Sequence, residues 1–487
     1  MAPEQPSRGA GASGRLKRAL LPVWWDRNYG IVFAARVAMS VGRSLAGVAA
    51  PIYLALEGFS AFELSLFVLV VAGASTLMST AIGLWSDRVG RRPFLVGVPL
   101  LAAGAAVGFA FTGSAPLLFV LGAFGSFGRG VGAGAGAIGP YQPAEAALVT
   151  EDLPAEHRNA GFGRLTFGSS AGATVGSLLA LLVSSSHAHG AAATALFRPA
   201  FLAISVTSAL AGVLALGLVE PGRKQAAQGG GGTDGPNAGV AEETRPPRRA
   251  TGGAVGGRKN RLHLPTKSRW LLYRLWATNS LNGLAIGMFG PFVTYWLYRR
   301  FGASAAEVGA LYAVINAATM ASSLSAAGLA RRWGLVRTVA VVRTAQALLI
   351  VPMVLAPSFA SAGAVYFVRM IVQRIGLPLR QSYAIGLAHP DERASVAALS
   401  NVPSQLAMSA SPLLTGYLFE AVSLSLPFEL AAGLQFANAI TFWGFFRHHP
   451  PEEETARELS AATAASELSA PAAELGLDRD DARASSG

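Results

Sequence analysis

The sequence predicts an all-α integral membrane protein with twelve transmembrane helices in two pseudo-symmetric, six-helix halves. Of its 487 residues, 52% are hydrophobic and only 14% are charged, whereas soluble domains average about 25% charged residues. The apolar residues gather into long stretches, and a helix needs about 20 mainly apolar residues to cross a bilayer. The stretches form two groups that flank one long polar segment. Composition, stretches and grouping together predict this fold class.

Each group contains six candidate spans. The first group comprises residues 29–56, 64–84, 94–111, 117–138, 162–183 and 201–219. The second group comprises residues 270–298, 308–329, 339–355, 360–379, 396–422 and 426–446. The first stretch is interpreted as a retained helix, because it is far longer than the roughly 7–15 apolar residues of a signal peptide.

The polar segments predict the remaining organisation. Residues 220–269 contain four consecutive glycines, several prolines and ten Lys or Arg, a composition that cannot bury enough apolar surface to fold. We expect a flexible, basic, cytoplasmic linker here, between an N-terminal bundle at 29–219 and a C-terminal bundle at 270–447. Residues 1–28 are expected to form a cytoplasmic N-terminal tail, and residues 448–487 a disordered cytoplasmic tail.

Basic residues predict the orientation in the cytoplasmic membrane. With both termini inside, the short inner loops carry nine Lys or Arg and the outer loops carry three, in agreement with the positive-inside rule. Arg299 and Arg300 lie on the outer side and do not fit, apart from a role as interface anchors. The net charge of +12 is therefore attributed to membrane orientation and not to nucleic-acid binding.

A charged motif lies between the second and third spans, with the sequence Gly83-Leu-Trp-Ser-Asp87-Arg88-Val-Gly90-Arg91-Arg92-Pro93. Glycines allow close helix approach, aspartate suits a neighbouring helix N-terminus, and arginines suit the anionic inner leaflet. This motif resembles the loop signature of the major facilitator superfamily. The resemblance extends over the chain through the six-plus-six layout, a degraded copy at 328–334, Arg129 with the glycines after it, and the glycines of the fifth span (Gly161, Gly168, Gly172 and Gly176).

The resemblance implies a secondary transporter. Its halves would tilt about a central site in a rocker-switch cycle. The loop would help to hold the cytoplasmic side closed through Gly83, Asp87, Arg88, Gly90, Arg91 and Arg92. We further expect a small-molecule solute as partner, membrane lipid around a monomer, and neither nucleic acid nor a cofactor or metal.

Charges inside the predicted spans are mostly positive. The deepest arginines are Arg36, Arg43, Arg129 and Arg369, and each costs about 2.5–3.5 kcal/mol at a helix centre. Acids inside the spans are limited to Glu420 and Glu429, both near outer ends. This imbalance favours an anionic solute, or alternatively arginines bound to helix carbonyls. Arg343, near a cytoplasmic end, is expected to snorkel into water.

Uncharged polar residues complete the substrate-binding candidates. Asn279 and Asn282 are three residues apart in the seventh span and share a helix face, and Gln373 lies in the tenth span. With the deep arginines, these residues are expected to contact solute. Asn316 and Gln346 are further candidates for the cavity lining.

Four charged residues are candidates for coupling or gating: Glu145, Arg158, Arg380 and Arg393. They belong to two stretches, each joining the fourth and fifth spans of its half and placing an arginine fifteen residues after a proline. In this alignment Glu145 falls opposite Arg380. The alignment predicts that the two side chains pair across the halves at the cytoplasmic mouth.

The sequence does not determine which solute is carried. Drug/proton antiporters of the superfamily usually carry a first-helix aspartate, whereas this helix carries Arg36 and Arg43. Proton-coupled drug efflux therefore competes with uptake or exchange of a small anion, and a non-transporting membrane sensor is an alternative of another class. We expect no enzyme, because no catalytic cluster appears. The glycines of 134–139 match a dinucleotide fingerprint by letter but lack the strand that it requires.

Overall fold

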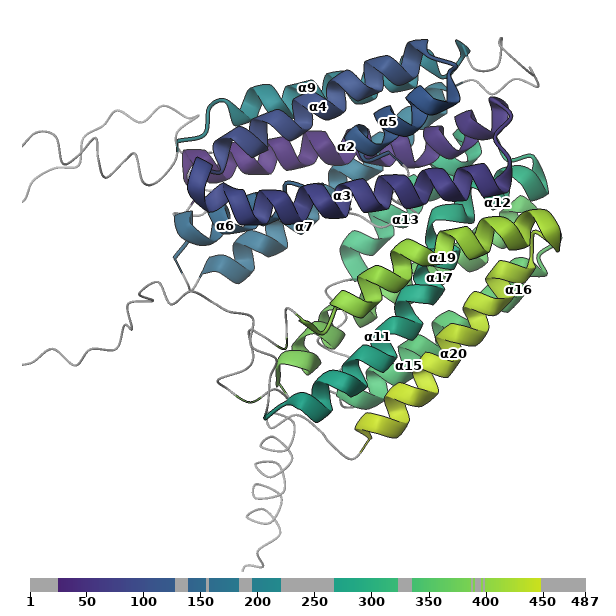
Figure 1. Cartoon of the computed structure of the whole chain (residues 1–487). Helices are drawn as coiled ribbons and strands as arrows, with labels where there is room; N and C mark the ends of the chain where they lie inside the picture. Colours follow the sequence, from purple (N-terminus) through teal and green to yellow (C-terminus); the bar gives the residue numbers. More distant parts are fainter. Residues whose placement is uncertain are drawn as a thin grey trace, which may run out of the picture.

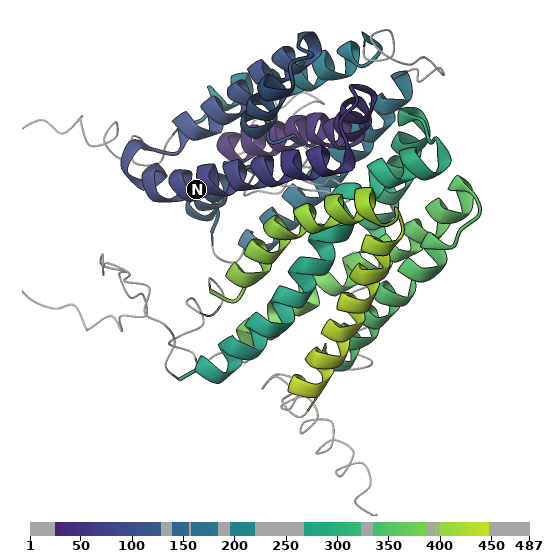
Figure 2. The same cartoon turned by 45° about the vertical axis from the view of Figure 1, so that its right-hand side comes forward.

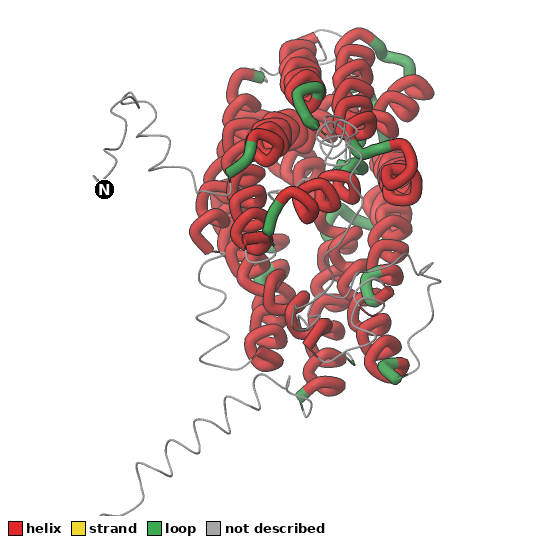
Figure 3. The backbone as a smooth tube through the Cα atoms, turned by 90° about the vertical axis from the view of Figure 1, so that its left-hand side faces the viewer, coloured by secondary structure: helices red, strands yellow, loops and turns green. Residues whose placement is uncertain are grey.

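The computed structural model describes residues 25–127, 139–154, 157–183, 195–219, 267–322, 335–386, 389, 396 and 399–447. Within these ranges the chain forms helices and no β-strand, and the helices lie side by side (Figure 3). The predicted all-α class is therefore confirmed.

Helices of the N-terminal part form one group and those of the C-terminal part another (Figure 1). The first group contains α2 (Arg27–Leu56), α3 (Ala61–Val89), α4 (Arg92–Phe111), α5 (Ala115–Gly125), α6 (Gln142–Asp152), α7 (Arg158–Leu179), the 3₁₀ turn η2 (Ala180–Leu182) and α9 (Arg198–Ala215). The second contains α11 (Arg269–Phe289), η4 (Gly290–Phe292), α12 (Val293–Phe301), α13 (Ala305–Ser322), α15 (Leu335–Leu348), α16 (Ile350–Val354), α17 (Phe359–Gly386), α19 (Val402–Ala421) and α20 (Leu426–Phe446).

Every predicted span has a helix at its position in the described part of the chain. Two spans are interrupted: a 3₁₀ turn that contains Pro291 separates α11 from α12, and α15 ends just before α16, which contains Pro352. Proline has no N–H to donate to the preceding turn, which explains both breaks. By length and hydropathy, six of the described helices qualify as membrane spans, so the count of twelve stays a prediction.

The exposed faces of these helices are apolar. Leu77, Leu182 and Leu355 are 74%, 77% and 73% exposed, and many other large apolar side chains are also uncovered. Water-soluble monomers rarely expose apolar patches of this extent. The faces suit a lipid solvent.

An internal repeat fixes the start of the second predicted span in each half, α3 and α13. Ser60 and Glu63 form a capping box at the N-terminus of α3. Ser304 and Glu307 exchange the same two backbone–side-chain hydrogen bonds before α13. Each serine lies two residues after a glycine with positive φ, 90° at Gly58 and 66° at Gly302, a conformation that glycine adopts without strain. This repeat is additional to the one that the sequence predicts between the fourth and fifth spans.

Glycines bring the helix backbones into contact within each half. A Cβ on Gly172 or Gly176 of α7 would lie 2.5 or 2.1 Å from a carbonyl oxygen of α2. In the second half, a Cβ on Gly283 or Gly287 of α11 would lie 2.3 or 2.5 Å from a carbonyl oxygen of α19. Small residues that permit such close approach are typical of membrane helix packing. The two crossings are equivalent in the repeat.

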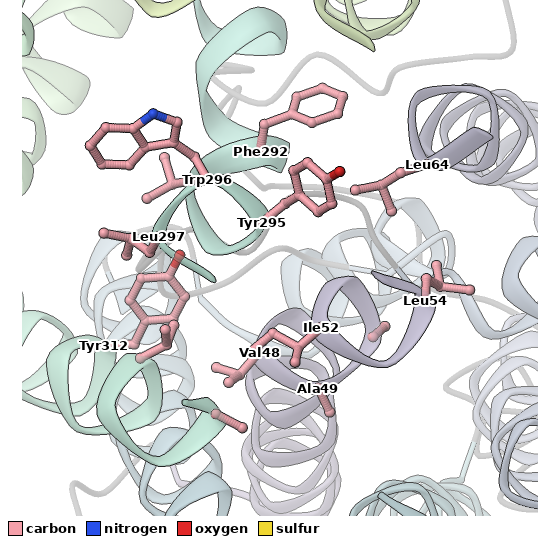
Figure 4. Packing of buried hydrophobic residues seen from close by; sticks show 14 of the residues in the cluster. Val48, Ala49, Ile52, Leu54, Leu64, Phe292, Tyr295, Trp296, Leu297 and Tyr312 are labelled. Atoms are coloured by element: carbon pink, nitrogen blue, oxygen red, sulfur yellow. The ribbon is translucent and has the colours of Figure 1, made fainter. Parts of the chain in front are cut away.

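The halves meet at the end of the bundle that carries the α2–α3 and α19–α20 connections. There the Phe62 backbone N–H donates to the Glu420 carboxylate at 3.2 Å, and a Cβ on Gly416 would lie 2.7 Å from the Ala61 carbonyl oxygen. Side chains of α2 and α3 pack against η4, α12 and α13 in one shared core (Figure 4). Toward the other end the two groups of helices diverge (Figures 1 and 2).

The two outer arginines that disagreed with the charge rule stack on aromatic rings at the end of α12. The Arg299 guanidinium lies 6.0 Å from the Tyr295 ring centroid, and that of Arg300 lies 5.7 Å from Trp296. Both lie in the last turn of the helix, where a cation also interacts favourably with the helix dipole. These contacts support the expected interface anchoring.

Gly176→Leu should prevent α7 from packing on α2, because the added side chain has no room beside the Val41 carbonyl. We expect a loss of at least about 1–3 kcal/mol of stability, measured as a lower melting temperature and less monodisperse protein in detergent. Gly104→Leu is the matched control, because a Cβ on Gly104 would meet nothing within 4 Å. Equal behaviour of the two variants would contradict the packing argument.

Candidate functional site

The charged loop between α3 and α4 contacts the end of α6 and the residues that follow α9. Gly90 has φ of 99° and its N–H donates to the Ser86 carbonyl, which ends α3. Arg91 forms an ion pair with Glu151 at the end of α6, and Arg92 donates to the Leu216 carbonyl after α9. The loop therefore joins α4 to α6 and α9 inside one half.

For the other predicted loop residues, the structure describes the backbone but not every side chain. A Cβ on Gly83 would lie 3.8 Å from Pro143, just inside α6, so the glycine keeps α3 close to that helix. The side chains of Asp87 and Arg88 lie outside the described ones. Their predicted role in gating stays a prediction.

A buried ion pair links α2 to α6. The Arg36 Nε donates to Glu145 Oε1 at 2.7 Å and Nη2 donates to Oε2 at 2.6 Å. The two side chains are 8% and 2% exposed, so the pair is bidentate and shielded from solvent. Such geometry offsets part of the desolvation cost of both charges.

This pair gives Glu145 a different partner from the predicted one. Both of its carboxylate oxygens accept from Arg36, within the same half. The side chain of Arg380 lies outside the described ones, so its pairing with Glu145 stays a prediction. Arg36 and Glu145 are both predicted site residues, but their separation by 109 residues in the chain kept their pairing from being predicted.

Arg43 lies on the same side of α2 as this ion pair. A Cβ on Gly139 would lie 3.2 Å from Arg43 Nη1 and 2.6 Å from the Tyr141 ring. Tyr141 itself is buried and lines a small cavity with Arg36 and Glu145. Arg36 and Arg43 therefore share a face, as the seven-residue spacing predicts.

In the C-terminal half, Arg369 of α17 is enclosed without a counter-ion in the described residues. Its side chain is 2% exposed, and its guanidinium carbon lies 4.0 Å from the Phe289 ring centroid. Nη1 donates to Gln373 at 3.4 Å, while the buried Nε has no hydrogen-bond partner there. Two predicted substrate-binding residues thus lie together.

Asn279 and Asn282 form contacts within the C-terminal half. Asn279 Nδ2 donates to the Ser400 carbonyl at 2.8 Å, and Asn282 Oδ1 accepts from Asn438 Nδ2 at 3.5 Å. Both are buried. In this state they join α11 to its neighbours.

The structure corrects the expectation for Arg343. This side chain is 4% exposed and donates from Nη1 to Asn438 Oδ1 at 2.7 Å, and its guanidinium lies 4.6 Å from the Phe442 ring centroid. It therefore turns inward instead of snorkelling. Asn438 and Gln435, three residues apart on α20, were not among the predicted site residues, although that spacing places two amides on one helix face.

Of the three remaining predicted site residues, the structure describes one. Arg158 begins α7 and donates from Nε to the Leu153 carbonyl at 3.2 Å, so it ties α7 to the end of α6. Arg129 and Arg393 lie outside the described residues. Across the described ranges, no group of three or more potential metal-ligating His, Asp or Glu side chains occurs.

Two features are typical of transporters: two groups of apolar helices that meet at one end, and buried arginines within each group. The Major Facilitator Superfamily model matches residues 32–376 and 275–473. The chain belongs to the major facilitator superfamily. This membership and the apolar helices establish a multi-pass membrane protein of a transporter family.

Solved structures share this superfamily fold. A bacterial homologue of the human lysosomal transporter Spinster, in an inward-facing unoccupied state, is 13% identical with a TM-score of 0.60, covering 87% of this chain and 95% of its own. A D-xylose–proton symporter is 13% identical, TM-score 0.60, covering 85% and 97%. A variant of the peptide transporter POT, solved with sulfate, is 14% identical, TM-score 0.63, covering 86% and 94%. No curated protein matches in sequence.

Removal of one partner of the Arg36–Glu145 pair should destabilise this superfamily member by about 3–5 kcal/mol, because the other charge is left buried alone. Arg36→Gln and Glu145→Gln should each lower the melting temperature in detergent, and the double variant should recover part of the loss. Arg36→Lys, which keeps the charge without the bidentate geometry, should be intermediate. A double variant as unstable as the sum of both single variants would show that the pair has no energetic coupling.

Proposed function

We propose that this chain is a secondary active transporter that moves a small anionic solute across the cytoplasmic membrane. It would act as a monomer and by rocker-switch alternating access, and it would carry out transport without catalysis. The observation that supports the anionic class is the buried Arg369 guanidinium, which has no acidic partner in the described residues. Family membership supports transport.

An unpaired charge is costly in the interior of a membrane protein. A guanidinium inside a membrane protein requires a partner or water, and an aromatic face and a 3.4 Å amide contact compensate it only partly. A carboxylate, phosphate or sulfonate would match its fork of donors. Phe289 covers Arg369 in this state, so a solute would reach it as α11 and α17 shift.

Hydroxyl groups connect this site to the other half. Tyr366 lies one turn before Arg369 and packs near Tyr312, with ring centroids 6.2 Å apart. The Tyr312 hydroxyl lies 2.8 Å from Thr294 Oγ1, which in turn lies 3.4 Å from the Gly47 carbonyl of α2. The site is therefore adjacent to the surface where the halves meet, which suits a solute whose binding alters their contact.

The contacts between the halves favour an inward-facing assignment for this state. They include Phe62 with Glu420 at the end predicted to lie outside and, between α7 and α13, Asn316 with Ser177. The helices diverge toward the end predicted to be cytoplasmic (Figure 2). Outward opening would have to break these polar contacts and re-form others at the Gly90 end.

Arg369→Gln should weaken solute binding by about 10–100-fold, the equivalent of one charged hydrogen bond. Purified protein would be screened for thermal stabilisation by lactate, succinate, phosphate, glucose and tetraphenylphosphonium, and each hit would be tested by counterflow in proteoliposomes. Arg300→Gln is the control, because Arg300 stacks on Trp296 at the membrane edge. Stabilisation by tetraphenylphosphonium alone would overturn the anionic class, and ligand binding without counterflow would favour a sensor.

The orientation predicts opposite labelling of two single cysteines in this cysteine-free chain. Ala115→Cys, at the exposed start of α5, should react with a membrane-impermeant maleimide in intact cells. His389→Cys, at an exposed position between α17 and α19, should react only after permeabilisation. The reverse pattern would place the charged loop outside and remove the proposed gating role.

A further inference from the structure

A groove between α15, α16 and α20 lies on the lipid-facing side of the C-terminal half, away from Arg369. It encloses about 420 Å³. Leu348, Val351 and Leu355 line one wall, and Glu429, Gly433 and Phe436 line the other. The three residues of the first wall are 58%, 47% and 73% exposed, so the groove opens toward the surrounding bilayer.

Two local features create this space. The helix is interrupted at Leu349, ahead of Pro352, so α16 no longer continues the line of α15. Opposite this break, α20 presents Ala432 and Gly433, and a Cβ on Gly433 would meet nothing within 4 Å. Apart from Glu429 at one end, the walls are apolar and offer water no polar partners, and the natural occupant is therefore a hydrocarbon chain.

The groove has one charged end. Glu429 lies in the first turn of α20, three residues from the helix start at Leu426, and therefore at the level of the membrane edge. Within the described ranges, its carboxylate forms no hydrogen bond or ion pair, in contrast to Glu63 and Glu307, which cap their own helices. An acid at the mouth of an apolar groove selects a cationic partner.

We propose that this groove binds a phospholipid with a primary ammonium headgroup, phosphatidylethanolamine, through Glu429 and the apolar walls. The ammonium group would donate to the Glu429 carboxylate, and one acyl chain would run past Gly433 to Phe436. These two ends are separated by about 10 Å along the helix, given about 1.5 Å per residue. Glu429 repels anionic phosphatidylglycerol, and the quaternary ammonium of phosphatidylcholine has no N–H to donate.

The test uses the purified full chain in detergent, with dioleoyl phosphatidylethanolamine, phosphatidylcholine or phosphatidylglycerol added in turn. We expect phosphatidylethanolamine to raise the melting temperature by several degrees more than either other lipid, and native mass spectrometry to retain it preferentially. Glu429→Gln should abolish this preference. Glu307→Gln is the matched control, because glutamine keeps the cap at α13 and the residue lies outside the groove.

A second variant tests the acyl-chain part of the groove. Gly433→Leu should fill the groove without a clash and reduce retention of phosphatidylethanolamine about tenfold. Gly444→Leu on the same helix also meets open space but lies outside the groove, and should bind like the unmodified protein. Equal stabilisation by all three lipids, or unchanged preference in Glu429→Gln, would overturn the proposal. Dissociation of a dimer by Gly433→Leu would also overturn it, since a second copy would then occupy the groove.

Discussion

Close contact between helix backbones at glycines is the constraint on which the rest of this structure depends. In lipid no hydrophobic effect drives helices together, so packing must supply the attraction. Gly172 and Gly176 allow α7 to touch the backbone of α2, and Gly283 and Gly287 allow α11 to touch that of α19. These equivalent crossings hold each half together as a unit, as the proposed rocker-switch motion requires. Of the polar site residues, Arg36 lies on α2 and Asn279 and Asn282 lie on α11.

The two halves share this helix packing but differ in how they compensate their buried positive charges. The N-terminal half neutralises its deep arginine internally, through the bidentate contact of Arg36 with Glu145. The C-terminal half holds Arg343 with the Asn438 amide and the Phe442 ring and leaves Arg369 without an acid in the described residues. This asymmetry locates the proposed solute contact in the second half. The proposed lipid contact at Glu429 lies on a separate face, so loss of either site leaves the other intact.

Much of the candidate site could be named from the sequence, but its pairings could not. Charged and amide residues inside apolar spans are visible by type and depth, because each has a large insertion cost. Their partners depend on which helix faces meet, which local spacing does not encode. Arg343 is an example. Its position near a helix end favoured snorkelling, whereas a hydrogen bond to Asn438 on the neighbouring helix α20 holds it inside. The capping-box repeat at Ser60 and Ser304 is visible in the sequence, but it covers only a few residues in each half.

By itself the sequence determined the all-α class, the positions of the helices and the superfamily resemblance. Apolar runs and the Gly83–Arg92 loop carry that information locally, because a bilayer requires continuous apolar helices whatever their neighbours. Only the tertiary structure decided that Glu145 binds Arg36, that Arg369 lies under Phe289, and that a groove opens beside Gly433. Each of these depends on contact between helices distant in the chain or on space left between them, and such contacts follow from packing.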